Sequence, residues 1–258
     1  MLLVIDVGNT NIVFGLFANK ELLCDFRIKT DTALSASDYE LELRSQLSAR
    51  SLDIEGVDGI AMASVVPRLD PVLTGTCTAI FGNAPFCIDP RLQKCMVIRY
   101  ETPETLGADR IVNAVAAYDR YKSAAIAIDM GTATTIDFVD ASGAYIGGAI
   151  VPGIATAAHA LFSRAAKLPE IELEYPDLVI GRTTVESMQS GIVAGYACLL
   201  SGMIGRMKSE SGTGARVIAT GGLTRLVAGH VPEIDDVDEH LLLRGLKILY
   251  ERRTPSRE

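Results

Sequence analysis

Two stretches of the sequence decide the fold: Asp6-Val-Gly-Asn-Thr10 and Asp129-Met-Gly-Thr-Ala-Thr-Thr135. Each follows an apolar run that is typical of a buried strand, and in each an acid ends the strand and a glycine begins a turn. An ungapped alignment places Asp129 on Asp6 at an offset of 123 residues, close to half of the 258-residue chain. A repeat of this length indicates that one structural unit occurs twice.

The elements expected after each turn also follow the same order. Two further strands come next in both copies, and helices alternate with strands after them. Ser37-x-x-Glu has the spacing of a capping box. Asp70-Pro71 predicts an N-cap at Asp70 with proline at the first helical position. The predicted strands span 2–8, 11–17, 21–28, 59–66, 85–88, 96–100, 125–131, 134–139, 144–151 and 217–222, and the predicted helices 37–50, 70–81, 107–121, 191–205 and 237–253.

This order of elements predicts the fold class. We expect an α/β fold of two similar lobes, residues 1–122 and 123–258, each a mixed sheet with flanking helices beside a central cleft. The first lobe would carry the first turn, and the second lobe would carry the second turn together with a later glycine turn, Thr220-Gly221-Gly222.

The composition excludes several classes of protein. Hydrophobic residues make up 48% and charged residues 22%, which is near the globular average and argues against disorder, collagen and coiled coils. A net charge of −8 gives no support for nucleic-acid or acidic-membrane binding. The five cysteines form no CxxC pair, so free thiols are expected rather than a zinc site or a disulfide framework. Since neither a secretory signal nor a membrane span is recognisable, we expect a cytoplasmic protein.

The two turns have the composition of a phosphate-binding site. Glycine allows a phosphate to approach the backbone, Asn and Thr side chains donate hydrogen bonds, and an adjacent Asp suits Mg²⁺. Seen alone, the turn after Asp6 could equally be an ordinary hairpin turn. Because the turn is duplicated together with its acid, we favour a polyphosphate site in which both turns bind the phosphates. Two acids that face each other could alternatively catalyse glycoside hydrolysis. The third glycine turn, at Gly221, is a weaker candidate for contact with the nucleoside.

A further candidate lies between the two copies, where Gly107-Ala-Asp-Arg110 stands at the start of a predicted helix. Asp109 in this place could simply complement the helix dipole and pair with Arg110. In a phosphoryl transfer it could instead accept the proton of the attacking hydroxyl, while Arg110 would donate to a carboxylate or phosphate.

These motifs together resemble those of a known family. The turns are similar to the phosphate-binding turns of the acetate and sugar kinase, heat-shock and actin superfamily, and the whole set is most similar to type III pantothenate kinases. The matching stretches span almost the whole chain in the expected order: 6–10, 63–67, 100–110, 128–137, 147–153, 168–169, 187–191 and 220–222. The resemblance implies two duplicated, ribonuclease-H-like (actin-like) lobes. It also implies that ATP phosphorylates pantothenate to 4′-phosphopantothenate, the first step of coenzyme A biosynthesis.

The resemblance further implies roles for individual residues. Asp109 would be the catalytic base, Asp6 would reach Mg²⁺ through water, and Asp129 would bind the monovalent cation, potassium or ammonium, that the family requires. ATP would contact Asp6, Val7, Gly8, Asn9, Thr10, Asn11, Ile12, Val13 and Thr132, with Gly221 on the nucleoside side. Pantothenate would contact Tyr100, Gly107, Ala108, Asp109, Arg110 and Thr184, the last of these from the partner subunit of a homodimer.

Two other functions stay open at this point. A kinase of the same fold could act on a small sugar or on another carboxylic acid. The chain could alternatively be a non-catalytic regulatory binder, but it contains Asp6, Asp109 and Asp129, and a pure binder needs no carboxylate at the position of proton transfer. Formation of 4′-phosphopantothenate, measured with and without potassium, separates these hypotheses.

Overall fold

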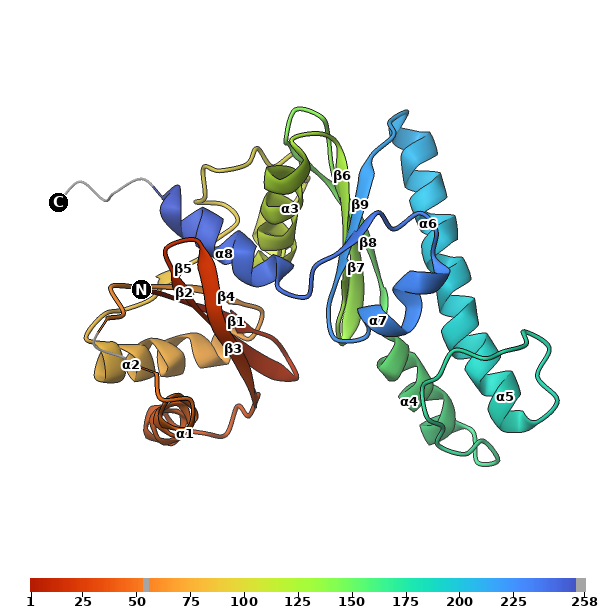
Figure 1. The fold of residues 1–258 in the computed structure, drawn as a ribbon, viewed down its shortest axis with the longest axis horizontal. Coiled ribbons are helices and arrows are strands. Elements are labelled where there is room, and N and C mark those ends of the chain that lie inside the picture. Colours follow the sequence, from red (N-terminus) through yellow and green to blue (C-terminus); the bar gives the residue numbers. More distant parts are fainter. Residues whose placement is uncertain (53–55, 254–258) are drawn as a thin grey trace. The chain divides into compact units, whose positions relative to one another are not determined.

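The computed structural model describes residues 1–52 and 56–253, which contain two five-stranded sheets with packed helices (Figure 1). The strands are β1 (Leu2–Val7), β2 (Asn11–Ala18), β3 (Glu21–Lys29), β4 (Gly59–Ser64), β5 (Phe86–Cys87), β6 (Ala125–Met130), β7 (Ala133–Val139), β8 (Tyr145–Pro152), β9 (Arg216–Thr220) and β10 (Asp236–Val237). The α-helices are α1 (Ala36–Ala49), α2 (Asp70–Phe81), α3 (Ala108–Tyr121), α4 (Ile154–Arg164), α5 (Thr184–Gln189), α6 (Gly195–Ser211), α7 (Thr224–Val227) and α8 (Leu241–Glu251). Short helices are η1 (Pro67–Leu69), η2 (Pro103–Thr105), η3 (Ser190–Ala194) and η4 (Ala228–His230).

The first sheet has the strand order β3-β2-β1-β4-β5. Short turns join β1, β2 and β3, so these strands are antiparallel neighbours, whereas β4 runs parallel to β1 and β5 runs parallel to β4. The parallel register pairs Asp6 with Ala63 and Val7 with Ser64. The carboxyl ends of β1 and β4 therefore lie at one edge of the sheet, which is where ligands bind in open α/β sheets.

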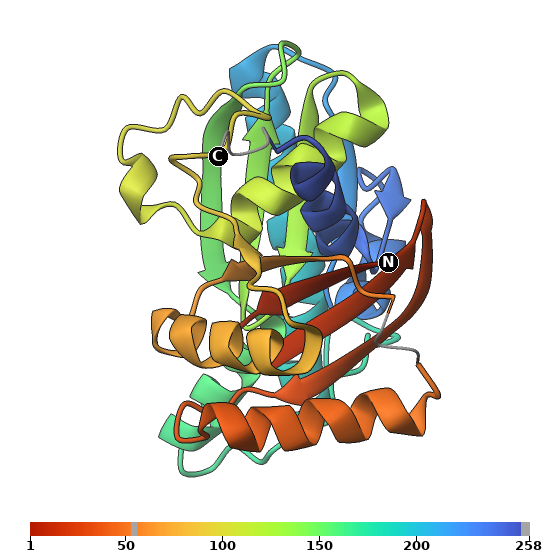
Figure 2. The same cartoon turned by 90° about the vertical axis from the view of Figure 1, so that its left-hand side faces the viewer.

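The side chains of β1 alternate between the two faces of this sheet. Leu3, Ile5 and Val7 belong to a core cluster that also contains side chains of α1 and α2, and Figures 1 and 2 show both helices on this face. Val4 points to the opposite face, where a Cβ atom on Gly15 would lie 3.1 Å from Val4 and 2.9 Å from a side-chain carbon of α8. Asp6 alternates in the same way and lies on the face opposite α1 and α2.

The second sheet has the order β10-β9-β6-β7-β8, which repeats the first sheet with β6 in the place of β1. β6, β7 and β8 are antiparallel neighbours, while β9 runs parallel to β6 and β10 runs parallel to β9. The predicted duplication is confirmed by strand order and direction. The copies differ in the turn, because residues 8–11 separate the paired Val7 and Ile12 but only residues 131–133 separate Met130 and Thr134.

Two apolar clusters cover the faces of the second sheet. Ile126, Ile128 and Met130 of β6 pack in a core with Tyr196, Ala197, Leu200 and Ile204 of α6 and Val227 of α7. The intervening residues Ala125 and Ala127 pack on the other face with Ala116 and Ala117 of α3. Asp129 follows the same alternation, so the carboxylate at the end of β6 is on the α3 face.

Residue contacts divide the chain into two compact units. Of the described residues, the first unit contains those in 1–52, 56–95, 102–115 and 242–253, and the second contains 96–101 and 116–241. The predicted boundary at 122/123 separates the two sheets along the chain, but α8 and the first half of α3 belong to the unit of the first sheet. A Cβ atom on Gly245 of α8 would lie 2.2 Å from the carbonyl oxygen of Val112 in α3, so a glycine is needed for these helices to approach. The lobe bounds 1–122 and 123–258 remain a prediction based on the repeat.

The caps of α1 and α2 differ from their predictions. The capping box of α1 consists of Ser35 and Asp38: the N–H of Ser35 donates to the Asp38 carboxylate at 2.9 Å, and the N–H of Asp38 donates to the Ser35 hydroxyl at 3.3 Å. The predicted box that begins at Ser37 is wrong because Ser37 is already helical. The N-cap of α2 is Leu69, and Asp70 is the first helical residue.

Other boundaries also differ. Residues 96–100 form no strand, and Ile98 makes only an isolated bridge to Tyr145. The predicted helix 237–253 begins later, at Leu241, because β10 precedes it. The sequence patterns predict neither α4 nor α7, and the predicted helix 191–205 extends over Thr184–Ser211 with π-type hydrogen bonding at η3.

The helical stretch Thr184–Ser211 is long and apolar enough to cross a membrane, and no other helix among residues 1–52 and 56–253 is. Of its most apolar window, 44% is buried within the protein. Its side chains form much of the core against β6, and a core helix passes the same test of length and composition. This stretch is therefore weak evidence for a membrane span.

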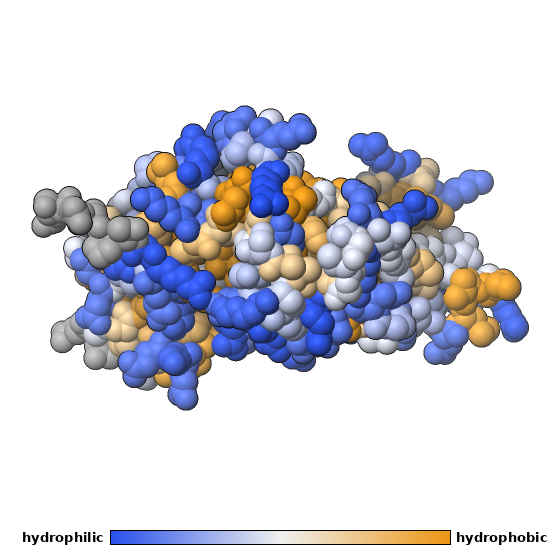
Figure 3. Space-filling model, turned by 90° about the horizontal axis from the view of Figure 1, so that it is seen from above, coloured by the Kyte–Doolittle hydropathy of each residue, from blue (hydrophilic) through white to orange (hydrophobic). Residues whose placement is uncertain are grey.

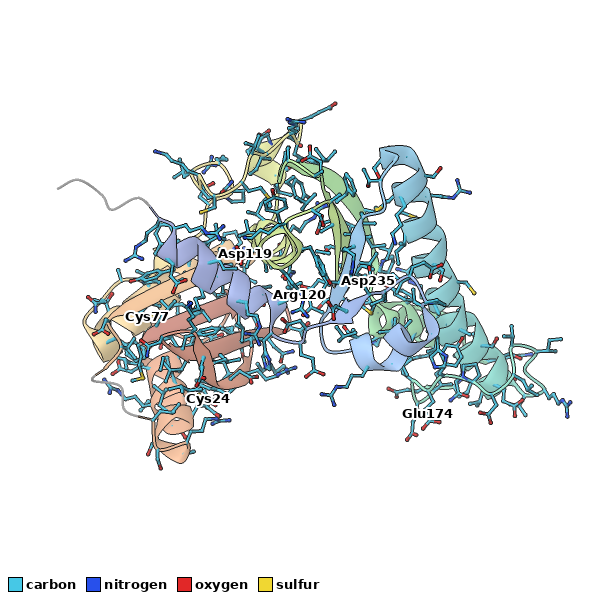
Figure 4. All side chains as sticks on the ribbon, turned by 45° about the horizontal axis from the view of Figure 1, so that its top comes forward. Cys24, Cys77, Asp119, Arg120, Glu174 and Asp235 are labelled. Carbon is cyan, nitrogen blue, oxygen red and sulfur yellow. The ribbon has the colours of Figure 1, made fainter. Side chains whose placement is uncertain are left out.

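All five cysteines are free thiols. Figure 4 labels Cys24 on β3 and Cys77 on α2, and both pack in the core of the first unit. Burial raises the pKa of the Cys77 thiol to about 12, so this thiol stays protonated and unreactive at neutral pH.

Candidate active site

The first predicted phosphate turn joins β1 to β2. The N–H of Gly8 donates to the carbonyl oxygen of Asn11 at 3.0 Å and closes the turn. Thr30, directly after β3, supports it: the Thr30 hydroxyl donates to the carbonyl oxygen of Gly8 at 2.7 Å, and the Thr30 N–H donates to that of Thr10 at 3.0 Å. Asn9 and Thr10 are exposed. The turn therefore presents polar side chains on a hydrogen-bonded base.

The residues on either side of this turn differ in how accessible their side chains are to the predicted ligand, ATP. Val7 and Ile12 are fully buried in the core of the first unit, so their side chains face away from a ligand. Asp6, Asn11 and Val13 are half-buried. Any contribution of Val7 and Ile12 to ATP binding is limited to their backbone groups.

Asp109 lies in the first turn of α3, in the same unit as Asp6. A Cβ atom on Gly107 would lie 2.4 Å from Oδ1 of Asp109 and 3.7 Å from a side-chain carbon of Val65. Val65 follows β4 and donates its N–H to the carbonyl oxygen of Val7 at 3.0 Å. The start of α3 therefore lies at the edge of the first sheet where β1 and β4 end, which is the edge that carries Asp6.

The surroundings of Asp109 favour its protonated form. Burial raises the pKa of the Asp109 carboxyl, against the opposing effects of the Arg110 backbone N–H, which donates to Oδ1 at 2.8 Å, and of the Arg110 guanidinium. A carboxylate with a raised pKa is a stronger base than an exposed one, as proton abstraction from a hydroxyl requires. The Arg110 side chain is only 6% exposed, and the hydrogen bond from Arg110 to Asp109 comes from its backbone N–H.

The second predicted phosphate turn joins β6 to β7 in the second unit. The N–H of Gly131 donates to the carbonyl oxygen of Ala133 at 3.1 Å. The carbonyl oxygen of Thr132 accepts from the N–H of Gly153 at 3.1 Å and from the hydroxyl of Thr156 at 2.7 Å. The first turn of α4 thus fixes this loop, and the Thr132 side chain remains exposed.

The glycine turn at Gly221 packs directly against the end of β6. Gly221 has a φ of 99°, and a Cβ atom on it would lie 2.6 Å from both the nitrogen and the carbonyl oxygen of Met130. Asp129 is in register with Thr220 of β9. The Thr224 hydroxyl donates to the carbonyl oxygens of Thr220 at 2.5 Å and of Gly221 at 2.8 Å. The second unit therefore brings Asp129, the second turn and Gly221 together at one sheet edge.

Tyr100 and Thr184 belong to the second unit but lie elsewhere in it. Tyr100 is half-buried beside the start of β8, and its ring contacts the ring of Tyr145 edge-on at 6.0 Å between centroids. Thr184 is exposed and begins the helical stretch that continues through α6 (Figure 1). The preceding Thr183 is the N-cap of α5, where it forms a capping box with Glu186. Thr183 therefore has a structural role.

Comparison with known proteins identifies the family. The family model described as type III pantothenate kinase matches residues 2–206. A type III pantothenate kinase from Moorella thermoacetica is 50% identical over 254 residues, which cover 98% of this chain and 100% of the relative. One from Geobacter sulfurreducens is 45% identical over 252 residues, which cover 98% and 99%. The chain belongs to the type III pantothenate kinase family.

The function follows from membership of this family: the protein is a kinase that phosphorylates pantothenate in coenzyme A biosynthesis. This result decides against the alternatives of another acceptor and of a non-catalytic binder. The predicted actin-like fold is confirmed by solved structures. A conserved putative Baf family transcriptional activator from Campylobacter jejuni matches with a TM-score of 0.61 at 19% identity, covering 96% of this chain and 97% of that one. A putative N-acetylglucosamine kinase from Porphyromonas gingivalis matches with a TM-score of 0.55 at 12% identity, covering 98% and 99%.

The carboxylates of Asp6 and Asp129 in this pantothenate kinase suit cations that take most of their ligands from the substrate and from water. Across the described parts of the chain, no three His, Cys, Asp or Glu side chains come together as a metal cage. Mg²⁺ usually keeps several waters and takes one or two carboxylates together with phosphate oxygens. Asp6 and Asp129 each supply a half-buried carboxylate beside an exposed turn. Such oxygen donors fit Mg²⁺ and an alkali cation.

The sequence motifs assign no individual role to three residues that support the turns of the kinase. Thr30 holds the first turn, and Gly153 and Thr156 hold the second. Gly153 could have been found, because it stands in the motif 147–153 and a Cβ atom on it would lie 2.2 Å from the carbonyl oxygen of Gly131. The roles of Thr30 and Thr156 depend on tertiary contacts that no local pattern reveals.

Proposed function

We propose that Asp109 is the general base of an in-line phosphoryl transfer from ATP to pantothenate. The hydroxyl oxygen of pantothenate attacks the γ-phosphorus, its proton passes to the Asp109 carboxylate, and the bond from the γ-phosphorus to the oxygen that leaves with ADP breaks. The observation that supports this role is the position of a carboxyl with a raised pKa at the edge where β1 and β4 end.

ATP phosphates, in this proposal, contact the first turn from Asp6 to Val13 and the second turn at Thr132, with Gly221 on the nucleoside side. Exposed backbone and hydroxyl groups of both turns donate to phosphate oxygens, and their internal hydrogen bonds keep these donors in place before ATP arrives. Asp6 holds Mg²⁺ through water and Asp129 holds a potassium or ammonium ion. Both cations, when bound, offset negative charge on the triphosphate.

Pantothenate contacts Tyr100, the segment Gly107–Arg110 and, from a second copy of the chain, Thr184. The support for a homodimer is the apolar surface next to Thr184. Leu178, Val179 and Ile180 are 58%, 72% and 84% exposed, and Val185 is 41% exposed. Figure 3 shows apolar side chains gathered at the end of the second unit that carries α5. An exposed apolar cluster of this kind is typical of a surface covered by a partner.

The proposed compartment is the cytoplasm, where ATP is available to a kinase of the coenzyme A pathway.

The test is direct. Purified protein with ATP, Mg²⁺ and pantothenate should form 4′-phosphopantothenate, and omission of potassium should reduce the rate. Ile180→Glu should shift the protein to a smaller species in gel filtration and weaken pantothenate turnover if Thr184 acts in the partner's site. A monomeric Ile180→Glu protein with unchanged kinetics would contradict that role.

A further inference from the structure

Tyr145, at the start of β8, is fully buried and makes contacts in three directions. Its hydroxyl donates to Oδ1 of Asp137 at 2.7 Å, and Asp137 in β7 is fully buried as well. Its backbone pairs with the segment 96–101: the Tyr145 N–H donates to the carbonyl oxygen of Val97 and its carbonyl oxygen accepts from the N–H of Arg99, both at 2.8 Å. Its ring meets the ring of Tyr100. One side chain thus links a buried acid to Tyr100.

The segment 96–101 has little other regular structure. It forms no strand, and its one bridge is the pairing of Ile98 with Tyr145. Arg99 adds an exposed ion pair with Asp140 at 3.3 Å, a kind of contact that contributes little to stability. Tyr145 therefore holds this segment by two backbone hydrogen bonds, on either side of Ile98, and by a ring contact with Tyr100.

Two glycines of β8 make the arrangement possible. A Cβ atom on Gly148 would lie 2.8 Å from Oδ1 of Asp137 and 2.1 Å from the carbonyl oxygen of Ile136, so only glycine leaves room for the buried carboxyl. Gly147 has a φ of 149°, and a Cβ atom on it would touch the Tyr100 ring at 3.7 Å. Burial of a carboxyl group lowers the stability of a fold unless the group is hydrogen-bonded. Asp137 is buried, and its Oδ1 accepts a hydrogen bond from the Tyr145 hydroxyl.

We infer that Asp137 and Tyr145 are positioning residues that hold Tyr100 in the orientation in which it contacts pantothenate. The inference rests on the proposed contact between Tyr100 and pantothenate. The hydrogen bond to Asp137 fixes the Tyr145 ring, and the edge-on contact passes this restraint to the Tyr100 ring. Neither Asp137 nor Tyr145 needs to touch the substrate.

The first experiment removes a single oxygen atom. Tyr145→Phe keeps the ring and the backbone pairing but loses the hydrogen bond to Asp137. We expect the KM for pantothenate to rise roughly three- to tenfold, with KM for ATP unchanged and kcat within about twofold. An equal rise in the KM for pantothenate and the KM for ATP would indicate a general structural defect and would overturn the inference.

The matched control is Tyr121→Phe. The Tyr121 hydroxyl also donates to a carboxylate, that of Asp236, at 2.9 Å. Asp236 belongs to β10, the edge strand of the same sheet on the side opposite β8. Arg120, labelled in Figure 4, pairs with the same carboxylate at 3.2 Å. Tyr121→Phe should lower stability without raising the KM for pantothenate.

A double-mutant cycle tests whether Tyr145 acts through Tyr100. In a Tyr100→Leu background, Tyr145→Phe should add nothing to the KM for pantothenate, because the ring that it positions is gone. Full additivity of the two effects would overturn the inference. A normal KM in Tyr100→Leu alone would instead overturn the proposed contact of Tyr100 with pantothenate.

A fluorescence measurement tests the positioning without substrate. The chain contains no tryptophan, so Tyr100→Trp introduces a single reporter at this position. Its emission anisotropy should fall when Tyr145→Phe or Asp137→Asn is added and should be unaffected by Tyr121→Phe. Unchanged anisotropy with both additions would show that the residues do not restrain position 100.

Discussion

A Cβ atom on Gly107 would lie 2.4 Å from Oδ1 of Asp109, closer than any side chain can approach a carboxylate oxygen without moving it. Gly107→Ala should therefore displace the proposed base and reduce kcat at least tenfold, since misplacement by about 1 Å can cost on the order of a hundredfold. Thermal unfolding should change little, because the carboxylate can turn away. Gly75→Ala in α2, where the new Cβ would have an ordinary contact at 3.7 Å, is the control and should keep full activity. Full activity in Gly107→Ala would argue against Asp109 as the base.

Replacing the base itself gives the second prediction. Asp109→Asn keeps the shape of the side chain but cannot accept the proton, so kcat should fall roughly a hundredfold or more. Pantothenate and ATP should still bind, as measured by calorimetry. The control is Asp119→Asn, which removes another carboxylate of α3, one that pairs with Lys122. This variant should leave kcat unchanged. Near-normal turnover of Asp109→Asn would exclude general-base catalysis by this residue.

The raised pKa of Asp109 leads to a prediction on pH. The free enzyme must carry a deprotonated base, so kcat/KM should fall as the pH drops through the pKa of Asp109, which lies above the ordinary 3.8. A group with a raised pKa holds more protons in the folded than in the unfolded state between these two values. Its contribution to stability is therefore present below pH 3.8 and is lost as the pH rises through the folded-state pKa.

The same argument predicts a stability gain in the inactive variant. At a pH above the folded-state pKa of Asp109, its partly buried charge opposes folding, so Asp109→Asn should raise the melting temperature there relative to the wild type. The difference should shrink as the pH falls through the pKa of Asp109. A melting temperature lowered at every pH would show that the carboxylate stabilises the fold.

The sequence predicts the duplicated hairpins well because each depends on local features: an apolar run, an acid and a glycine. Both sheets have the strands expected after Asp6 and Asp129. Local patterns fail where tertiary contacts decide. Residues 96–100 read as a strand, but only Ile98 finds a bridge partner, and α8 packs with the first sheet although it follows the second in the chain. The hydroxyls that brace the two turns belong to segments distant in sequence, so no motif around the turns could indicate them.

Cation dependence tests the role of Asp129. Activity of the wild type should be lost when Mg²⁺ is chelated and should rise when potassium or ammonium replaces a larger organic cation at constant ionic strength. Asp129→Asn should abolish the response to potassium and leave the requirement for Mg²⁺. Asp140→Asn, a partly exposed acid in the same unit that pairs with Arg99, is the control and should respond to potassium as the wild type does. A normal potassium response in Asp129→Asn would remove this residue from the cation site.

The adjacent glycines of the third turn give the last prediction. Alanine at Gly221 would need a φ of 99° and would place its Cβ 2.6 Å from two backbone atoms of Met130, whereas a Cβ on Gly222 would have nothing within 4 Å. The left-handed conformation alone costs about 1–2 kcal/mol for alanine, and the clash with backbone cannot be relieved by a rotamer change. Gly221→Ala should therefore lower the melting temperature and separate the end of β9 from β6, with a raised KM for ATP and an unchanged KM for pantothenate. Gly222→Ala should have the melting temperature, the KM for ATP and the KM for pantothenate of the wild type. If both substitutions changed these values equally, the close approach of Gly221 to Met130 would not be what positions the nucleoside side of the site.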